Sequence, residues 1–180
     1  LNGQLNGATA HCVSCAKVLN AEAIDVLVLS DAGHAVAEQA AKISGVSKVL
    51  VADNAANAHA IAQVLAPQIA EAANGYSHVF GPSTTFGKDL MPCVAALLGV
   101  AQVSDVMTVE SSHSFKRPIY AGNAIITVNA PSDKAVVATV RTASWPAAEH
   151  GGSAAIESVT LSAALPTHTR FVSLQQGKSD

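Results

Sequence analysis

Two patterns of apolar residues alternate along the first hundred positions. Continuous apolar runs are typical of strands buried on both faces, and they occur at 25–30 (DVLVLS), 48–53 (KVLVAD) and 77–83 (SHVFGPS). Around them, apolar residues recur at helical spacing. The predicted helices are 7–19, 33–43, 57–73 and 88–98. Pro67 should bend or split the third of these helices, and Pro92 should lie near the first turn of the fourth.

This alternation predicts an α/β fold in three layers, built on a doubly wound and mostly parallel sheet. The pattern lacks a strand before the first helix, where this architecture requires one, so we expect a strand to be missing there. After Val100 the pattern no longer alternates between helices and strands. The predicted strands are then 102–110, 115–129, 135–144 and 154–162, a β-rich C-terminal portion. Between two of them, the Gly122-Asn123 pair is a hairpin turn signal.

Composition and charge argue against two classes of function, nucleic-acid binding and membrane insertion. The 180 residues are 49% hydrophobic and only 13% charged, against roughly 25% charged in an ordinary soluble domain. The net charge is −3 and the basic residues are scattered, so we expect no nucleic-acid binding. Because no apolar run is long enough to cross a bilayer, we expect no membrane insertion and a location in the bacterial cytoplasm or the mitochondrial matrix.

The stretch FGPSTTFGKD at 80–89 resembles a phosphate-binding loop. Such a loop has four residues between its glycines, and a Ser or Thr hydroxyl follows its Lys. Here five residues separate the glycines, and Asp89 follows Lys88. We therefore interpret the stretch as a strand-to-helix turn. The alternative is a nucleotide-binding module that holds AMP or ATP at the carboxyl end of this strand, as open α/β sheets do. Its residues would be Ser83, Thr84, Gly87 and Lys88.

Other candidate chemistry is sparse. Cys12 and Cys15 form a C-x-x-C pair inside a predicted helix, without a second pair at zinc spacing, so we interpret them as apolar side chains facing the sheet. An enzyme that uses both thiols is the open alternative. The seven histidines and the carboxylates form no recognisable set, so we expect no catalytic residue and no metal site. Lys116, Arg117 and Arg141 either pair with an anionic partner or cofactor, or are solvated charges near a hairpin.

Several stretches read together resemble the alpha subunit of the electron transfer flavoprotein. The matching pieces are SHVFGPSTTFGKDLMPCVAALLGVAQVSDV, RPIYAGNAI, TVRTASWPAA followed by GGSAA, and the tail LQQGKSD. Their order and spacing also agree, and the resemblance extends over nearly the whole chain. It implies an adenine nucleotide alpha hydrolase-like fold. It also implies that residues 1–164 form the amino-terminal domain and residues 165–180 a linker toward an FAD-binding domain absent from this sequence.

The resemblance further implies a function for the intact protein. Paired with a beta subunit that binds AMP, such a protein carries electrons from flavin dehydrogenases of fatty-acid and amino-acid oxidation to a membrane quinone oxidoreductase. It is an electron carrier rather than an enzyme, and its FAD lies mainly in the absent domain. This chain would be a scaffold and docking domain that binds no cofactor, with its loop at 83–88 a vestige of a nucleotide site. We expect a face that meets the beta subunit or the flavin domain at Tyr120, Gly122, Asn123 and Arg141.

Two departures limit this transfer. The pair of Cys12 and Cys15 is not a signature of the family, so it is not interpreted as an electron relay. Ala143 lies where many relatives have Thr, so a hydroxyl contact to the flavin domain at this position would be missing. The family also begins with a short central strand that precedes Leu1. We expect another segment to fill that place, because a missing central strand leaves unpaired backbone on both of its neighbours.

Overall fold

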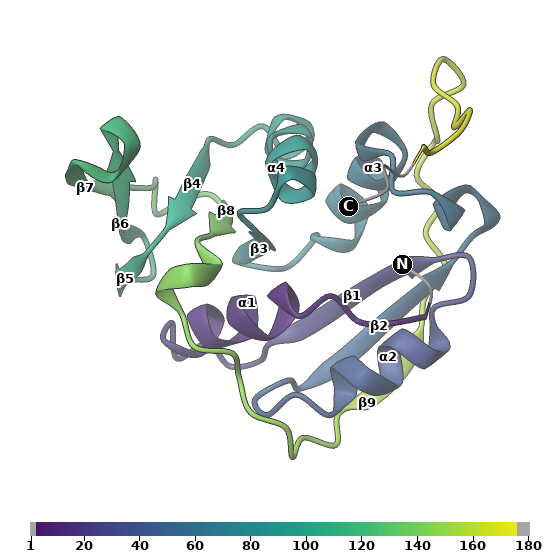
Figure 1. Ribbon diagram of the computed structural model, residues 1–180, viewed down its shortest axis with the longest axis horizontal. Helices are drawn as coiled ribbons and strands as arrows, with labels where there is room; N and C mark the ends of the chain where they lie inside the picture. Colours follow the sequence, from purple (N-terminus) through teal and green to yellow (C-terminus); the bar gives the residue numbers. More distant parts are fainter. Residues whose placement is uncertain (1–2, 176–180) are drawn as a thin grey trace, which may run out of the picture.

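The computed structural model describes residues 3–175 as layers of helices and strands (Figure 1). The helices are α1 (Ala8–Lys17), α2 (His34–Ala41), α3 (Ala62–Ala72) and α4 (Thr85–Leu98), and the 3-10 helices are η1 (Ala55–Ala58), η2 (Tyr120–Gly122) and η3 (Thr142–Ser144). The strands are β1 (Asp25–Ser30), β2 (Lys48–Asp53), β3 (His78–Pro82), β4 (Gln102–Val106), β5 (Thr108–Ser111), β6 (Ser114–Ile119), β7 (Ala124–Asn129), β8 (Val136–Val140) and β9 (Ala155–Ser158). Among the described residues, no helix is long and apolar enough to cross a membrane.

Within residues 3–175 the strands form three sheets. The orders β1-β2-β9 and β3-β8-β4 are parallel throughout, whereas β5-β6-β7 is antiparallel. This confirms the predicted α/β class with mostly parallel strands. The residues after Val100 are rich in strands as predicted, but β8 ends at Val140 and β9 at Ser158, short of the predicted ends at 144 and 162. The structure adds that β8 and β9 belong to the two parallel sheets, and that only β5, β6 and β7 form the separate antiparallel sheet, at the left of Figure 1.

Alternate residues of the parallel strands pack into different clusters, which defines the layers. Val28 of β1 packs with α2, whereas its neighbour Leu29 packs with α3 and α4. In β8, Val136 packs with α1, whereas Val137 packs with α4. Because successive side chains of a strand point to opposite faces, α1 and α2 cover one face and α3 and α4 the other. This is the predicted three-layer arrangement.

The two parallel sheets are joined by side chains rather than by backbone. Among the described residues, β1 pairs only with β2, and β3 pairs only with β8. Each therefore has an edge without a strand, at the point where the sequence pattern lacks one. The Tyr76 hydroxyl, just before β3, donates to the Asp25 carboxylate of β1, and Leu29 and Val79 share one apolar cluster. That another segment occupies this place stays a prediction.

The helix predicted at 57–73 begins later than expected. Asn54 caps η1 by accepting the Ala56 N–H at 2.9 Å, and the backbone then becomes extended at His59 and Ile61 before α3 starts. The buried amides of Asn57 and Gln68 exchange hydrogen bonds at 2.7 and 3.1 Å, which fixes this corner. The prediction of one helix is thus wrong here, and the interruption lies upstream of Pro67, which α3 includes.

The helix predicted at 88–98 begins earlier than expected. Thr84 has extended backbone and its hydroxyl accepts the Gly87 N–H at 3.2 Å, so it caps a helix that starts at Thr85. Pro92 consequently lies in the middle of α4 rather than near its first turn, and that part of the prediction is wrong.

The strand predicted at 102–110 is two strands that belong to different sheets. Asp105 has φ +61°, and the register of β4 against β8 shifts between Val103 and Val106. After this irregularity the chain leaves the parallel sheet at Met107 and pairs with β6 as β5. The irregularity sets the Asp105 side chain against the site described below.

After Ser158 the chain runs back along α3, and its described residues, up to 175, form no helix or strand. The Glu71 carboxylate accepts the N–H and hydroxyl of Ser162 at 2.9 Å each, and the N–H of Ala163 at 2.6 Å. Further on, the Phe171 ring stacks on His59 with 3.5 Å between ring centroids. Within the predicted linker at 165–180, the part at 176–180 lies outside the described residues.

Candidate functional site

A cavity of about 690 Å³ opens at the carboxyl ends of β3 and β8. Its wall is completed by the start of α4, by the irregularity in β4 and by the hairpin turn between β6 and β7. The residues that line it are Ser83, Lys88, Asp105, Arg117, Pro118, Ile119, Tyr120, Ala121, Gly122, Arg141, Thr142 and Ala143. The carboxyl edge of parallel strands is where open α/β sheets bind ligands. The cavity volume falls within the usual range for small-molecule sites, roughly 300–1,000 Å³.

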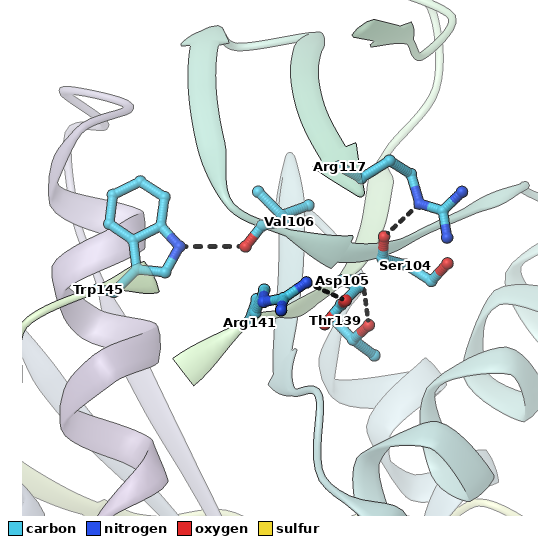
Figure 2. Close-up of polar contacts among 7 residues, drawn as sticks. All are labelled: Ser104, Asp105, Val106, Arg117, Thr139, Arg141 and Trp145. Atoms are coloured by element: carbon cyan, nitrogen blue, oxygen red, sulfur yellow. Dashed lines mark hydrogen bonds and ion pairs between the residues drawn. The ribbon is translucent and has the colours of Figure 1, made fainter. Parts of the chain in front are cut away.

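Asp105 is held in an unusual backbone conformation at the wall of this cavity. Its φ of +61° is uncommon for a residue other than glycine. The Asp105 N–H donates to the hydroxyl of the fully buried Thr139 at 2.9 Å, which stabilises this conformation. Its carboxylate pairs with the Arg141 guanidinium at 3.3 Å (Figure 2). Strained backbone held by its surroundings is typical of functional sites.

Arg117 reaches the same segment from β6. Its Nε donates to the Ser104 carbonyl at 2.6 Å, so the guanidinium is anchored beside Asp105 (Figure 2). Trp145 holds Val106, the residue after Asp105, because its indole N–H donates to the Val106 carbonyl at 3.1 Å. The β4 irregularity is therefore fixed from three directions, and the positions of both arginines follow from it.

The charge of the cavity differs from that of the chain. Lys88, Arg117 and Arg141 face a single carboxylate, that of Asp105, among the lining residues. The whole chain, by contrast, has a net charge of −3. The cavity is thus a local region of positive charge on an acidic protein, which favours an anionic group.

The hairpin turn at the rim holds three successive residues in the left-handed region. The φ angles are 49° at Tyr120, 55° at Ala121 and 91° at Gly122, and the Asn123 side chain donates to the Tyr120 carbonyl at 2.7 Å. This confirms a turn between two antiparallel strands at 120–123. It leaves the Tyr120 side chain 78% exposed beside the cavity.

The cavity brings together five of the eight residues that the sequence analysis assigned to the loop at 83–88 or to the partner face. They are Ser83, Lys88, Tyr120, Gly122 and Arg141. Thr84, Gly87 and Asn123 are adjacent but do not line it: Thr84 and Gly87 form the cap of α4, and Asn123 closes the hairpin turn. The two groups of candidates, separate along the sequence, therefore meet at one site.

Packing accounts for both glycines of the loop that resembles a phosphate-binding loop. A Cβ atom on Gly87 would lie 1.8 Å from the Pro82 carbonyl oxygen, and one on Gly81 would lie 2.6 Å from the Met91 sulfur. The two glycines thus let α4 pack closely against the end of β3. This supports the interpretation of a strand-to-helix turn, and whether the loop holds a nucleotide stays a prediction.

The sequence analysis did not single out Asp105. It gave Arg117, with Lys116 and Arg141, as a residue that either pairs with an anionic partner or cofactor or is a solvated charge near a hairpin, and the structure places Arg117 in the cavity wall. The signal for Asp105 was a carboxylate inside the otherwise apolar-patterned stretch QVSDVM, but its role depends on the positive φ angle and on Thr139, 34 residues away in the sequence. Such a long-range contact leaves no local pattern.

The cysteine pair lies in the core. Cys12 and Cys15 are buried in the cluster that joins α1 to β4, β6 and β8, as the apolar interpretation predicts. Burial raises the pKa of both thiols to about 12, which makes them poor nucleophiles at neutral pH. Within residues 3–175, no three His, Cys, Asp or Glu side chains gather in a way that could hold a metal ion.

Comparison with known proteins agrees with the resemblance noted in the sequence. The family model described as the electron transfer flavoprotein domain matches residues 1–164. The electron transfer flavoprotein subunit alpha of Pseudomonas aeruginosa is 50% identical over 180 residues, which is 99% of this chain and 57% of that protein. The Paracoccus denitrificans subunit alpha is 44% identical, with the same coverage. The mitochondrial subunit alpha of Dictyostelium discoideum is 39% identical over 87% of this chain and 46% of its own length. The chain thus spans about half the length of these relatives.

Proposed function

This chain belongs to the electron transfer flavoprotein domain family, and from that membership we propose that it is the scaffold and docking domain of an alpha subunit. Residues 1–164 form the domain, and residues 165–180 lead toward the part of the protein that holds FAD. The domain associates with a beta subunit that binds AMP. The assembled protein carries electrons from flavin dehydrogenases to a membrane quinone oxidoreductase. In this role the domain positions its partners and catalyses no reaction itself.

The observation that carries the proposal is an edge strand with exposed apolar side chains. β7 is the outer strand of the antiparallel sheet, so one of its backbone edges has no neighbour among the described residues. Ile125 is 57% exposed and Ile126 is 37% exposed, and Tyr120 stands beside them in the turn. A protein that works alone usually blunts such an edge with charge or with proline. Here the edge remains apolar, which is typical of a surface that another chain covers.

The docking face defined by Tyr120, Gly122, Asn123, Ile125 and Arg141 combines this apolar edge with the positive charge of the cavity. Aromatic and arginine side chains dominate the binding energy of protein interfaces, whereas scattered surface charges contribute little. We therefore assign the apolar contacts of the interface to Tyr120 and Ile125, and its orientation to Arg141. The interior thiols of Cys12 and Cys15 take no part, because they are buried on α1 behind the parallel sheet.

A matched pair of variants tests this face. Ile125→Asp places a charge on β7, and Leu97→Asp places the same charge on α4 at an equal exposure of 57%. Calorimetric titration with an electron transfer flavoprotein beta subunit should show at least about a tenfold loss of affinity for Ile125→Asp, and none for Leu97→Asp. Equal affinities for both variants and the parent chain would show that β7 is not the docking face.

A further inference from the structure

We propose that the cavity beside η2 binds the phosphate group of a small phosphorylated molecule in this chain without a beta subunit present. Tyr120, Gly122 and Arg141 line this cavity and also belong to the proposed docking face. The proposal goes beyond the docking role and does not rest on it. It depends on the charges, the fixed geometry and the size of the cavity.

The charges come from three separate elements. Lys88 projects from α4, Arg117 from β6, and Arg141 follows β8. Only the Asp105 carboxylate opposes them among the lining residues, and it pairs with Arg141 at 3.3 Å. Lys88 and Arg117 are left without a carboxylate partner in the described part of the chain. Two uncompensated cations match the charge of a phosphate monoester, which is close to −2 at neutral pH.

The geometry is fixed before any ligand arrives. The Nε of Arg117 is occupied by the Ser104 carbonyl at 2.6 Å, so the outer edge of its guanidinium is set in place for an oxyanion. Arg141 is anchored through Asp105, which is itself held by Thr139. The two arginine side chains therefore lose little conformational entropy when an anion binds, and this favours affinity.

One further group at the wall lacks a partner. The Ser83 hydroxyl is buried and makes no hydrogen bond within the described residues. An unsatisfied buried hydroxyl is uncommon, because a buried polar group without a partner destabilises the fold. A phosphate oxygen entering beside Lys88 offers an acceptor to this hydroxyl after rotation about its Cα–Cβ bond.

The size of the cavity indicates more than inorganic phosphate. At about 690 Å³ it is large enough for an organic group attached to the phosphate. The exposed Tyr120 ring stands at the rim, where it can pack against a flat or apolar moiety. The class of ligand is therefore a phosphate monoester, with the phosphate between Lys88 and Arg117 and the rest of the molecule toward Tyr120.

This site differs from a phosphate-binding loop. In such a loop the backbone N–H groups at the start of the helix bind the phosphate. Here Gly87 N–H donates to the Thr84 hydroxyl at 3.2 Å, and neither residue lines the cavity. Side chains, rather than the α4 terminus, supply the binding groups, and so charge-removing variants test the proposal directly.

The experiment titrates this chain with three probes: inorganic phosphate, ribose 5-phosphate and AMP. Calorimetry and phosphorus NMR are used at low ionic strength, because exposed charges are screened by salt. Lys88→Gln and Arg117→Gln each remove one positive charge from the cavity. Lys134→Gln is the control, since it removes one exposed positive charge outside the cavity. Asp105→Asn removes the opposing carboxylate.

We expect saturable binding of the phosphate probes that weakens by about tenfold in Lys88→Gln and in Arg117→Gln, as the loss of a charge-assisted contact implies. Lys134→Gln should bind like the parent chain, and Asp105→Asn should bind more tightly. Tighter binding of AMP than of ribose 5-phosphate would assign the organic group to a base stacked near Tyr120, and equal binding would assign it to the sugar phosphate alone. Absence of saturable binding, or equal weakening in Lys134→Gln, would overturn the proposal.

Discussion

Replacement of Gly87 by alanine should destabilise the protein strongly. Gly87 is the second glycine of the loop that resembles a phosphate-binding loop, but we expect the loss to come from packing and not from a ligand. An added Cβ would lie 1.8 Å from the Pro82 carbonyl oxygen, whereas real Cβ atoms are essentially never found within 3.0 Å of such an atom. The end of β3 and the start of α4 would have to separate by about 1.2 Å, the difference between these distances. The obstructing atom belongs to the backbone, so no side-chain rotation relieves the contact.

The magnitude follows from overpacking of a close backbone contact. Insertions of a methyl group into a packed region cost typically 1–3 kcal/mol when side chains or backbone must shift. Because here the backbone itself must move, we expect about 3 kcal/mol. The Thr84 cap lies in the same turn, and its hydrogen bond to the Gly87 N–H at 3.2 Å would be disturbed as well.

Urea unfolding followed by circular dichroism measures this loss, with Gly7→Ala as the matched control. Gly7 has φ −56° and no atom within 4 Å of an added Cβ, so the same change there should alter the free energy of unfolding by less than about 0.5 kcal/mol. A Gly87→Ala variant as stable as Gly7→Ala would refute the packing argument, and the glycine would then call for a ligand-based explanation.

Three other predictions concern titratable groups. The hydrogen bond from the Ser162 N–H is the main cause that lowers the pKa of Glu71. We therefore expect the Ser162 amide to be protected from hydrogen exchange above the usual pKa of Glu, and to lose this protection as the pH falls through the lowered pKa. Protection of the Ser162 amide that changes neither with this fall in pH nor in Glu71→Gln would contradict the prediction. Burial, together with Asp25, raises the pKa of Tyr76 from 10.0 to about 12. The stabilisation that the neutral phenol gives the folded protein is therefore complete below pH 10.0 and is lost as the pH rises through about 12. Ultraviolet titration should find the Tyr76 phenol protonated near pH 11, and an ionised phenol at that pH would refute the assignment. In native protein an alkylating reagent should modify Cys93 before the two buried thiols, and mass spectrometry showing the reverse order disproves their burial.

Patterns with a local cause could be predicted from the sequence. The strands at 25–30 and 48–53 occur as predicted, because continuous apolar runs have few alternatives in a fold of this size. The prediction placed the start of α4 too late, because a Ser- and Thr-rich stretch is typical of a turn. In the structure the Thr84 hydroxyl caps the helix at the start of that stretch. Competition between a side-chain cap and a turn is decided by one hydrogen bond, which the pattern does not contain.

The site required contacts that no single stretch contains. The candidate residues of the loop at 83–88 and of the hairpin at 120–123 were found separately, and only the pairing of β3 and β4 with β8 brings them to one cavity. The positive φ angle of Asp105 arises where the chain passes from a parallel to an antiparallel sheet. Which sheet each half of this apparently continuous strand joins depends on tertiary contacts. The sequence therefore indicated neither where the strand divides nor that the Asp105 carboxylate would face the cavity.

The most direct test of the account is the sedimentation of this chain mixed with an electron transfer flavoprotein beta subunit. We predict that the parent chain forms a one-to-one complex with the beta subunit at micromolar concentrations, and that Ile125→Asp weakens this complex. Two separate boundaries at every concentration, with both proteins folded, would contradict the proposal that this domain is the scaffold on which the electron carrier assembles.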